Sequence, residues 1–333
     1  KRDSQWLEQT LRVPATVAAI GALGGVALLA LNQATALRMG LHEYSRANLL
    51  NMLRTGAPLP FVAVACLLVP DSRAAAAAQT VVIACVAVYA WARIGAARIN
   101  TPLPAGSLRS LLSYGSLAYF SNLLHYVAIR GLLLGLSFFA TPAAVGFANL
   151  ALLLLEALLL VPSAIGQLLF PQSSDEAFNA RAMESVLRLA LVIALVAALV
   201  MALVAPAVST AILGERYLEV GVALRHLAPS FVLMTVPRIL SPVLAGRGKP
   251  QLPLIGAALS VAAGTPLALW LMPQQGLLGT MWVINAVSLC TAVVMLRGYM
   301  NESGSGWLSV LVPRRSEILQ WWLALRRFAR HTA

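Results

Sequence analysis

Runs of apolar residues long enough to cross a bilayer recur along this chain and constrain its fold more than any other feature. A hydrocarbon core about 30 Å thick needs a helix of about 20 apolar residues to cross it. Charged residues make up only 11% of the sequence, against about 25% in a soluble domain. A transmembrane β-barrel would alternate polar and apolar residues, and these runs do not. We predict an all-α, polytopic transmembrane helix bundle.

The runs predict nine membrane spans joined by short connections. The fourth is longer than one crossing requires, so we expect its start to project from the bilayer. The spans are Val13–Leu37, Leu49–Val69, Ala76–Ala97, Ser107–Phe139, Ala143–Phe170, Val186–Val208, Val222–Ala245, Leu252–Met272 and Leu277–Arg297.

The basic residues lie mostly between the spans and predict the orientation. With nine spans, 16 of the 24 Lys and Arg fall on one side of the membrane and five on the other. Cytoplasmic loops carry the excess, so the richer side, which includes the C-terminus, is assigned to the cytoplasm. This topology explains the net charge of +12 without nucleic acid as a partner. It leaves Lys1 outside, a conflict that helices upstream of Lys1 would remove.

Glu156 stands alone among apolar residues near the centre of the fifth span. A carboxylate there costs several kcal/mol unless it is protonated, paired or facing water. Three further polar residues share its helical face: Asn149, Ser163 and Gln167. Pro162 predicts a break in the same helix. This face is either a site for a coupling cation, H⁺ or Na⁺, or a structural lock in which Glu156 pairs with an arginine such as Arg130.

Arginines and amides in other spans form a second set of candidates. An arc of about 80° in the fourth span carries Tyr119, Asn122, Tyr126 and Arg130. This face either lines a cavity or bonds to neighbouring helices. In the seventh span, Arg225 near the outer end either contacts substrate or anchors the helix. Arg238 lies deeper, on a helix that prolines should kink. The excess of arginine over acid favours an anionic substrate.

Motifs for catalysis or metal binding are absent from the sequence. The three cysteines, Cys66, Cys85 and Cys290, lie in apolar runs without ligand spacing and are interpreted as packing residues. Gly246–Pro250 (GRGKP) lacks the spacing of a phosphate-binding loop. We predict neither a metal, nor a cofactor, nor enzymatic activity.

Several segments resemble a known family. They are LRSLLSYGSLAYFSNLLHYVAIRGLLLG (Leu108–Gly135), VGFANLALLLLEALLLVPSAIGQLLFPQSS (Val145–Ser174), LGERYLEVGVALRHLAP (Leu213–Pro229), ILSPVLAGRGKPQLPLI (Ile239–Ile255) and MPQQGLLGTMWVINAVS (Met272–Ser288). They are similar to polysaccharide-biosynthesis flippases of the multidrug/oligosaccharidyl-lipid/polysaccharide exporter superfamily, with Thr280 where that family has alanine. The resemblance covers about Leu37 to Arg297 and is strongest from Leu108 to Phe170.

The resemblance implies two pseudo-symmetric lobes of six helices around a central cavity, with nine of twelve helices in this chain. Residues 1–97 would be the C-terminal part of the N-lobe, 98–106 the cytoplasmic linker, 107–300 the C-lobe and 301–333 a cytoplasmic tail. Within that tail, Ser316–Arg330 has an apolar face with Trp322 and a basic face, typical of an interfacial helix. A membrane anchor is the simpler interpretation and a partner-binding helix the alternative.

The function implied by the resemblance is translocation of a polyprenyl-diphosphate-linked oligosaccharide or polysaccharide repeat unit. It would occur by cation-coupled alternating access in the bacterial cytoplasmic (inner) membrane. Membrane lipid, the lipid-linked glycan and other polysaccharide-assembly proteins would be partners. The family's glutamate falls on Glu156, its membrane arginine on Arg130 and its tenth-helix basic residue on Arg238. Leu132 stands where relatives often carry an acid, which leaves Arg130 for Glu156 or a diphosphate.

Four alternatives remain. A cation-coupled multidrug or small-molecule exporter would need an acidic cavity, and a lipid II flippase would differ mainly in the glycan. A membrane glycan polymerase or glycosyltransferase would need a large segment outside the membrane, whereas the longest outer loop is Ser209–Gly221. The fourth alternative is a scaffold that does not transport.

Overall fold

A computed structural model describes residues 15–41, 43–69, 71–94, 107–173, 180–312 and 317. Every regular element in this part of the chain is a helix, which confirms the predicted all-α class. The chain divides into two compact units, Lys1–Leu103 and Pro104–Ala333. The division falls within residues 98–106, the predicted linker, and each unit is described by itself.

Several helices among the described residues fit a multi-pass membrane protein. Seven are long and apolar enough to cross a membrane, and a bent pair of helices, Pro142–Leu158 with Leu160–Phe170, is an eighth candidate. The seven candidates are Thr16–Met39, Ser45–Leu68, Arg73–Ala92, Gly115–Phe139, Arg181–Leu213, Ala228–Gly246 and Gln251–Ser303.

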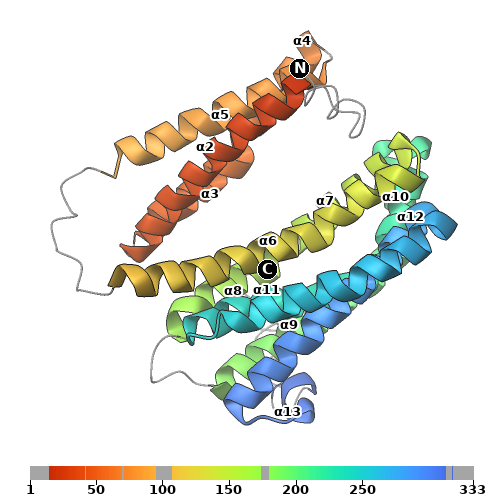
Figure 1. Cartoon of the computed structure of the whole chain (residues 1–333). Coiled ribbons are helices and arrows are strands. Elements are labelled where there is room, and N and C mark those ends of the chain that lie inside the picture. Colours follow the sequence, from red (N-terminus) through yellow and green to blue (C-terminus); the bar gives the residue numbers. More distant parts are fainter. Residues whose placement is uncertain are drawn as a thin grey trace, which may run out of the picture. The chain divides into compact units, whose positions relative to one another are not determined.

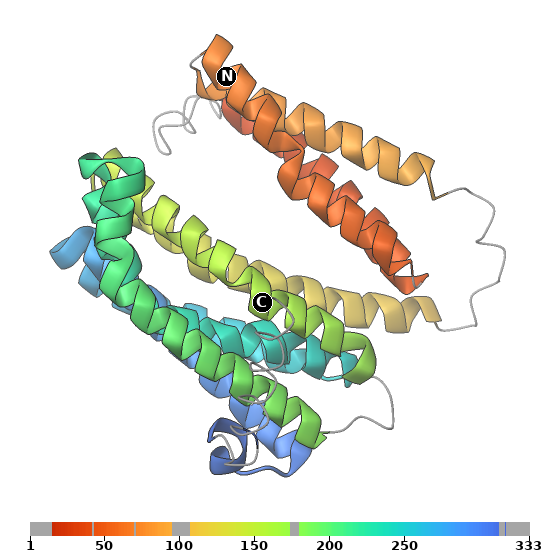
Figure 2. The same cartoon turned by 180° about the vertical axis from the view of Figure 1, so that it is seen from behind.

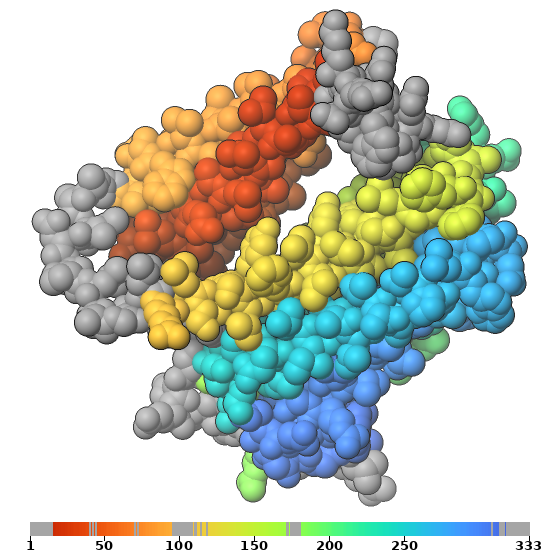
Figure 3. All heavy atoms as spheres, viewed as in Figure 1, coloured from red at the N-terminus to blue at the C-terminus, as the bar shows by residue number. Residues whose placement is uncertain are grey.

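Unit 1 is a small helical bundle in which α2 and α5 run in the same direction, with contacts of Thr80 to Ile20 and of Trp91 to Ala30. Its helices are α2 (Ala15–Gly40), α3 (Tyr44–Gly56), α4 (Pro58–Leu68) and α5 (Ser72–Ala92). Figure 3 shows α2 and α5 packed along their length, around a core that includes Leu31, Leu50 and Ala87. Trp91 Nε1 donates to the carbonyl of Ala30 at 2.9 Å and so ties the end of α5 to α2.

Unit 2 holds the remaining helices, shown from both sides in Figures 1 and 2. Two clusters of buried apolar residues form its core, one around Leu136 and Leu152 and the other around Leu187, Ile239 and Tyr299. The helices are α6 (Ser107–Phe139), α7 (Pro142–Leu158), α8 (Leu160–Ser173), α9 (Ala180–Leu213), α10 (Leu218–His226), α11 (Ala228–Gly246), α12 (Gln251–Ser303) and α13 (Trp307–Leu311), with a short 3₁₀ turn at Glu215–Tyr217.

Three of the predicted spans are divided between two helices in the structure. The second is divided only at Ala57, between α3 and α4, and still counts as one candidate crossing. The fifth bends by 45° between α7 and α8. Pro162 has no N–H to donate to the carbonyl of Leu158, four residues earlier. The carbonyl of Leu159 accepts from both the N–H and the hydroxyl of Ser163, at 3.1 and 2.8 Å. The seventh is divided at Leu227 into α10 and α11, and Pro229 follows in the first turn of α11. Arg225 and Arg238 therefore belong to different helices.

The last helix, α12, holds two of the predicted spans. Its backbone leaves the helical conformation at Gly276, with φ 52° and ψ −117°, values that glycine adopts at low cost. The chain turns back there, from the cyan to the blue part of α12 in Figure 1. The two halves pack together, because Ser260 Oγ donates to the carbonyl of Val287 at 3.0 Å and Gly264 leaves room for the Val287 side chain.

The segment after α12 packs on the start of α9. Val310 is fully buried in the second core cluster. Arg188 of α9, only 1% exposed, donates to both carboxylate oxygens of Glu317, at 2.9 and 2.5 Å, and also to the carbonyl of Ser309. Glu184 lies 3.5 Å from the same guanidinium. Apart from Glu317, the predicted interfacial helix Ser316–Arg330 lies outside the described residues.

Candidate functional site

Glu156 of α7 forms an ion pair with Arg130 of α6. Arg130 Nη2 donates to both carboxylate oxygens, at 2.9 and 2.8 Å. Its Nη1 donates to Asn149 Oδ1 at 3.1 Å. The side chains of Arg130 and Glu156 are 24% and 37% exposed, so the pair is partly shielded. This geometry is that of the structural lock, one of the two interpretations of the Glu156 face.

The other two members of that face lie beyond the bend. Ser163 and Gln167 are on α8, and they line a cavity of about 310 Å³ instead of flanking Glu156. A helical-face argument assumes one straight axis, and the 45° bend between α7 and α8 removes that condition. The single predicted face is thus two sites, a pair around Glu156 and part of a polar cavity.

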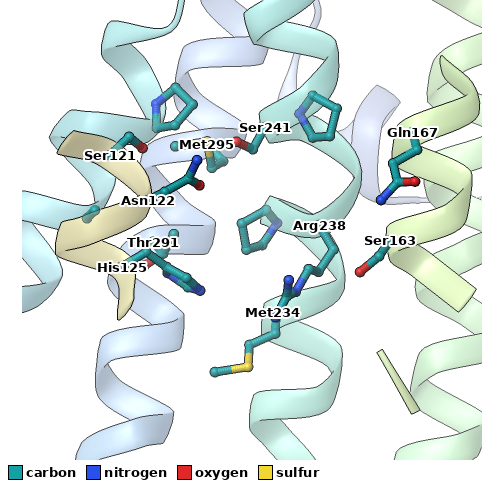
Figure 4. A pocket seen from close by; sticks show the side chains of 14 residues that line it. Ser121, Asn122, His125, Ser163, Gln167, Met234, Arg238, Ser241, Thr291 and Met295 are labelled. Carbon is teal, nitrogen blue, oxygen red and sulfur yellow. The ribbon is translucent and has the colours of Figure 1, made fainter. Parts of the chain in front are cut away.

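The cavity lies between helices of unit 2 (Figure 4). Four helices contribute polar side chains to its lining: Ser121, Asn122 and His125 from α6, Ser163 and Gln167 from α8, Arg238 and Ser241 from α11, and Thr291 from α12. Met234 and Met295 add apolar surface. A polar cavity bounded by otherwise apolar helices is where a membrane protein handles a polar or charged group.

Arg238 is the charged group of this lining. No described residue forms a hydrogen bond or an ion pair with its guanidinium, and it is half-buried. Asn122 and Gln167 likewise have no hydrogen-bond partner in the part of the chain that the structure describes. Unpaired donors around one cavity indicate that water or a ligand satisfies them. Because Arg238 is a cation and its neighbours in the lining are neutral, the cavity favours binding of an anion.

No protein-family model and no curated protein matches the chain. The flippase family therefore stays a prediction from the segments quoted above.

Close packing of α8 on α11 positions Arg238. Pro242 has no N–H to donate to the carbonyl of Arg238, four residues earlier. Gly166 lies directly against that carbonyl oxygen, and a Cβ at Gly166 would overlap it. The two helices can approach at this point only because residue 166 has no side chain. Gly166 therefore holds Ser163 and Gln167 beside the arginine.

Only two of the six predicted cavity residues, Asn122 and Arg238, line this cavity. Tyr119 and Tyr126 are 59% and 63% exposed, and Arg130 is paired with Glu156. Arg225 of α10 donates through Nε to the carbonyl of Ala202 at 2.9 Å, away from the cavity lining. That bond makes it a contact between α10 and α9, closer to the predicted anchor than to a substrate ligand.

The face of α6 that lines the cavity differs from the predicted one. Ser121, Asn122 and His125 line the cavity. Of the predicted arc, only Asn122 does so, while Tyr119, Tyr126 and Arg130 are not in the lining. The predicted arc was chosen by its large polar side chains, whereas Ser121, a small residue, lies on the face of α6 that lines the cavity. His125, one turn after Ser121, was the missed signal.

Metal-binding clusters are not found among the described residues: no three His, Cys, Asp or Glu side chains gather there. Cys66 and Cys85, interpreted from the sequence as packing residues, are exposed, and Cys290 is partly buried.

Proposed function

We propose that this chain belongs to a flippase that moves a polyprenyl-diphosphate-linked oligosaccharide or polysaccharide repeat unit across a bacterial cytoplasmic membrane. The observation that carries the proposal is the unpaired Arg238 facing a polar cavity inside apolar helices. An arginine within a membrane span costs several kcal/mol and is usually retained for function. A diphosphate is the anionic part of such a substrate, and guanidinium groups bind phosphate oxygens well.

The charges around the cavity support an anionic ligand. Glu156 is already hydrogen-bonded to Arg130, so it acts on Arg238 only through the longer-range attraction of opposite charges, and no described acid is bonded to Arg238. Asn122, Gln167 and Ser241 add neutral hydrogen-bonding groups that suit phosphate or hydroxyl oxygens. The volume of about 310 Å³ is at the lower end for small-molecule pockets. It suits a diphosphate with the adjoining sugar, while the rest of the glycan would lie outside.

The proposal includes the finer architecture expected from the sequence. The two halves of α12 would be two crossings and the bent α7–α8 pair one. With the other six candidate helices they give nine spans in this chain, of twelve in the complete two-lobed transporter. The C-terminus would be cytoplasmic. In alternating access, H⁺ or Na⁺ at Glu156 would compete with Arg130, so that opening of this pair couples the cation to movement of the helices.

The test is translocation of a lipid-linked glycan by the full-length protein reconstituted in vesicles. We expect Arg238→Gln to lower the initial rate at least tenfold, which corresponds to about 1.4 kcal/mol, and Arg238→Lys to retain part of it. Arg225→Gln is the matched control, since Arg225 bonds to a backbone carbonyl outside the cavity, and it should stay within about twofold of the parent. An undiminished rate in Arg238→Gln would refute the assignment.

A further inference from the structure

We propose that unit 1 carries a separate binding site for the phosphate group of an anionic membrane lipid. The site is a second cavity, of about 320 Å³, at one end of α2, α3 and α5. Its lining consists of Arg38, Arg46, Leu49, Leu50, Tyr89 and Arg93. It lies entirely within unit 1, and the proposal does not depend on the one made for the cavity around Arg238.

Charge at this second cavity is predominantly positive. Glu43 accepts from Arg38 at 2.7 Å and from Arg46 at 3.0 Å. Arg93 instead lies over the ring of Tyr89, with its guanidinium carbon 5.6 Å from the ring centroid. Among the described residues, one carboxylate beside three guanidinium groups leaves two positive charges, enough for a phosphate diester or monoester. Arginine suits this role because its planar fork matches phosphate oxygens.

Arg38 provides an independent indication that an acceptor is missing. Its side chain is buried, with the residue only 4% exposed. One of its donors, Nε–H, has no hydrogen-bond partner in the part of the chain that the structure describes. Buried donors are rarely left unsatisfied in native proteins, and an unpaired one calls for a bound group. An anion in the cavity lined by Arg38 would supply acceptor oxygens next to this guanidinium.

The position of the site favours a lipid over a dissolved anion. Arg38 lies in the last turn of α2, Arg46 in the first turn of α3, and Arg93 caps α5. These helix ends lie together at one end of the unit in Figures 1 and 2. They are also the ends of three candidate spans, which is the depth of the phospholipid head groups. The charge distribution predicts that this end faces the cytoplasm.

Apolar surface beside the arginines fits the same ligand. Leu49 is 47% exposed and Tyr89 is 45% exposed, and both line the cavity. A lipid would place its phosphate on the guanidinium groups and its glycerol and upper acyl chain on this surface. Inorganic phosphate would leave that surface in contact with water. Anionic head groups are attracted to juxtamembrane arginines, whereas a zwitterionic lipid is attracted less.

The experiment measures lipids retained by the purified full-length protein in native mass spectrometry. Phosphatidylglycerol, phosphatidylcholine and inorganic phosphate are offered in separate arms. The test variant is the double substitution Arg46→Gln with Arg93→Gln, since both side chains are exposed and removing them should leave the core intact. The control is Arg54→Gln, also an exposed arginine of α3, which bonds to Asn32 outside the cavity.

We expect the parent and Arg54→Gln to retain phosphatidylglycerol at least fivefold more than the double variant does. Phosphatidylcholine should be retained weakly by all three. Equal retention of phosphatidylglycerol by the double variant and the parent would overturn the site. Displacement of the lipid by millimolar inorganic phosphate would overturn the lipid assignment, because a dissolved phosphate would then be the ligand. The rate of flipping by Arg238→Gln tests the proposed function and does not affect lipid retention by unit 1. Either proposal can therefore be refuted without refuting the other.

Discussion

At the scale of single residues, the pair between Arg130 and Glu156 separates two uses of charge in these helices. Arg130 is neutralised by a bonded acid, whereas Arg238 has no bonded partner among the described residues. The sequence placed both arginines among the candidate cavity residues, because periodicity along one helix cannot show which partner a neighbouring helix supplies. An ion pair with an arginine such as Arg130 was one of the two interpretations of the Glu156 face, and the structure contains that pair.

A double-mutant cycle on this pair tests its contribution to stability. Glu156→Gln and Arg130→Gln should each lower the melting temperature, because each leaves an unpaired charge near apolar residues. The double variant should lose less than the sum of the two, with a coupling free energy of about 1–2 kcal/mol, between the values for exposed and buried pairs. Thermal unfolding in detergent measures all four proteins. Strictly additive losses would mean that the two side chains do not interact.

The carboxyl group of Glu43 should make the stability of the protein depend on pH. Partial burial acts to raise the pKa of this carboxyl, but hydrogen bonds and charge from Arg46 and Arg38 outweigh it and hold the pKa below the ordinary value of 4.5. Because the folded-state pKa is lowered, the stabilisation is present above pH 4.5 and lost as pH falls through the lower, folded-state value. Melting temperatures of the parent and Glu43→Gln should therefore differ at pH 7 and converge in acid. A constant difference at every pH would contradict this.

At the scale of helices, interruptions decide which residues meet. Pro162 predicted a break in the fifth span, which the structure has between α7 and α8. That this break would separate Ser163 and Gln167 from Glu156 was not predicted from the sequence. The break at Leu227 was missed, although Arg225, His226 and Pro229 lie next to it, because the run from Val222 to Ala245 has the length and overall polarity of a single span. Arg188, near the start of the predicted sixth span, is buried and bonded to Glu317, which lies 129 positions further along the chain. No local pattern reports such a contact.

Packing of α8 on α11 is tested with two glycines. In Gly166→Ala the new methyl group would overlap the carbonyl oxygen of Arg238, so the helices must separate. We expect a loss of about 1–3 kcal/mol, typical of overpacking, together with a reduced rate of flipping. In Gly146→Ala of α7 nothing lies within 4 Å of the added Cβ, so alanine should be neutral or stabilising by up to about 1 kcal/mol. Similar melting temperatures for both variants would refute the packing argument.

The contact between the C-terminal segment and α9 is tested at Glu317. Glu317→Gln removes the main partner of the buried Arg188, and breaking a buried pair costs about 3–5 kcal/mol. Glu302→Gln is the control: Glu302 pairs with Lys249 at 2.8 Å, with side chains 26% and 41% exposed, and such pairs contribute about 0–1 kcal/mol. Melting temperatures should fall clearly in the first variant and little in the second. The reverse order would show that the segment does not hold α9.

At the scale of the whole molecule, the all-α class and the membrane-type helices could be predicted from the sequence, because the length and polarity of each run are local properties. The cavity could not, since its lining comes from four helices and includes several small polar residues. No sequence pattern singles out Ser121, Ser241 and Thr291. Only the structure shows that they line the same cavity as Arg238. Membrane orientation is a further property of the whole chain that can be tested directly.

Orientation is tested by labelling single cysteines in a background without Cys66, Cys85 and Cys290. Gln274 lies near the turn of α12 and is exposed, and Arg109 is exposed near the start of α6. The charge distribution predicts opposite sides for them. An impermeant maleimide added to intact cells should label Gln274→Cys readily, and Arg109→Cys only after permeabilisation. Labelling in the opposite pattern would invert the proposed topology.

The turn at Gly276 bears on how the chain enters the membrane. Residues 250–296, which include this turn and most of both flanking helices, contain no charged side chain. Moving such a turn across the bilayer requires no transfer of charge, in contrast to loops that carry arginine. The small residues Gly256, Ser260 and Gly264 already fit the second half of α12. The hairpin is therefore suited to insert as a single preassembled element, against the preceding helices of the chain already in the bilayer.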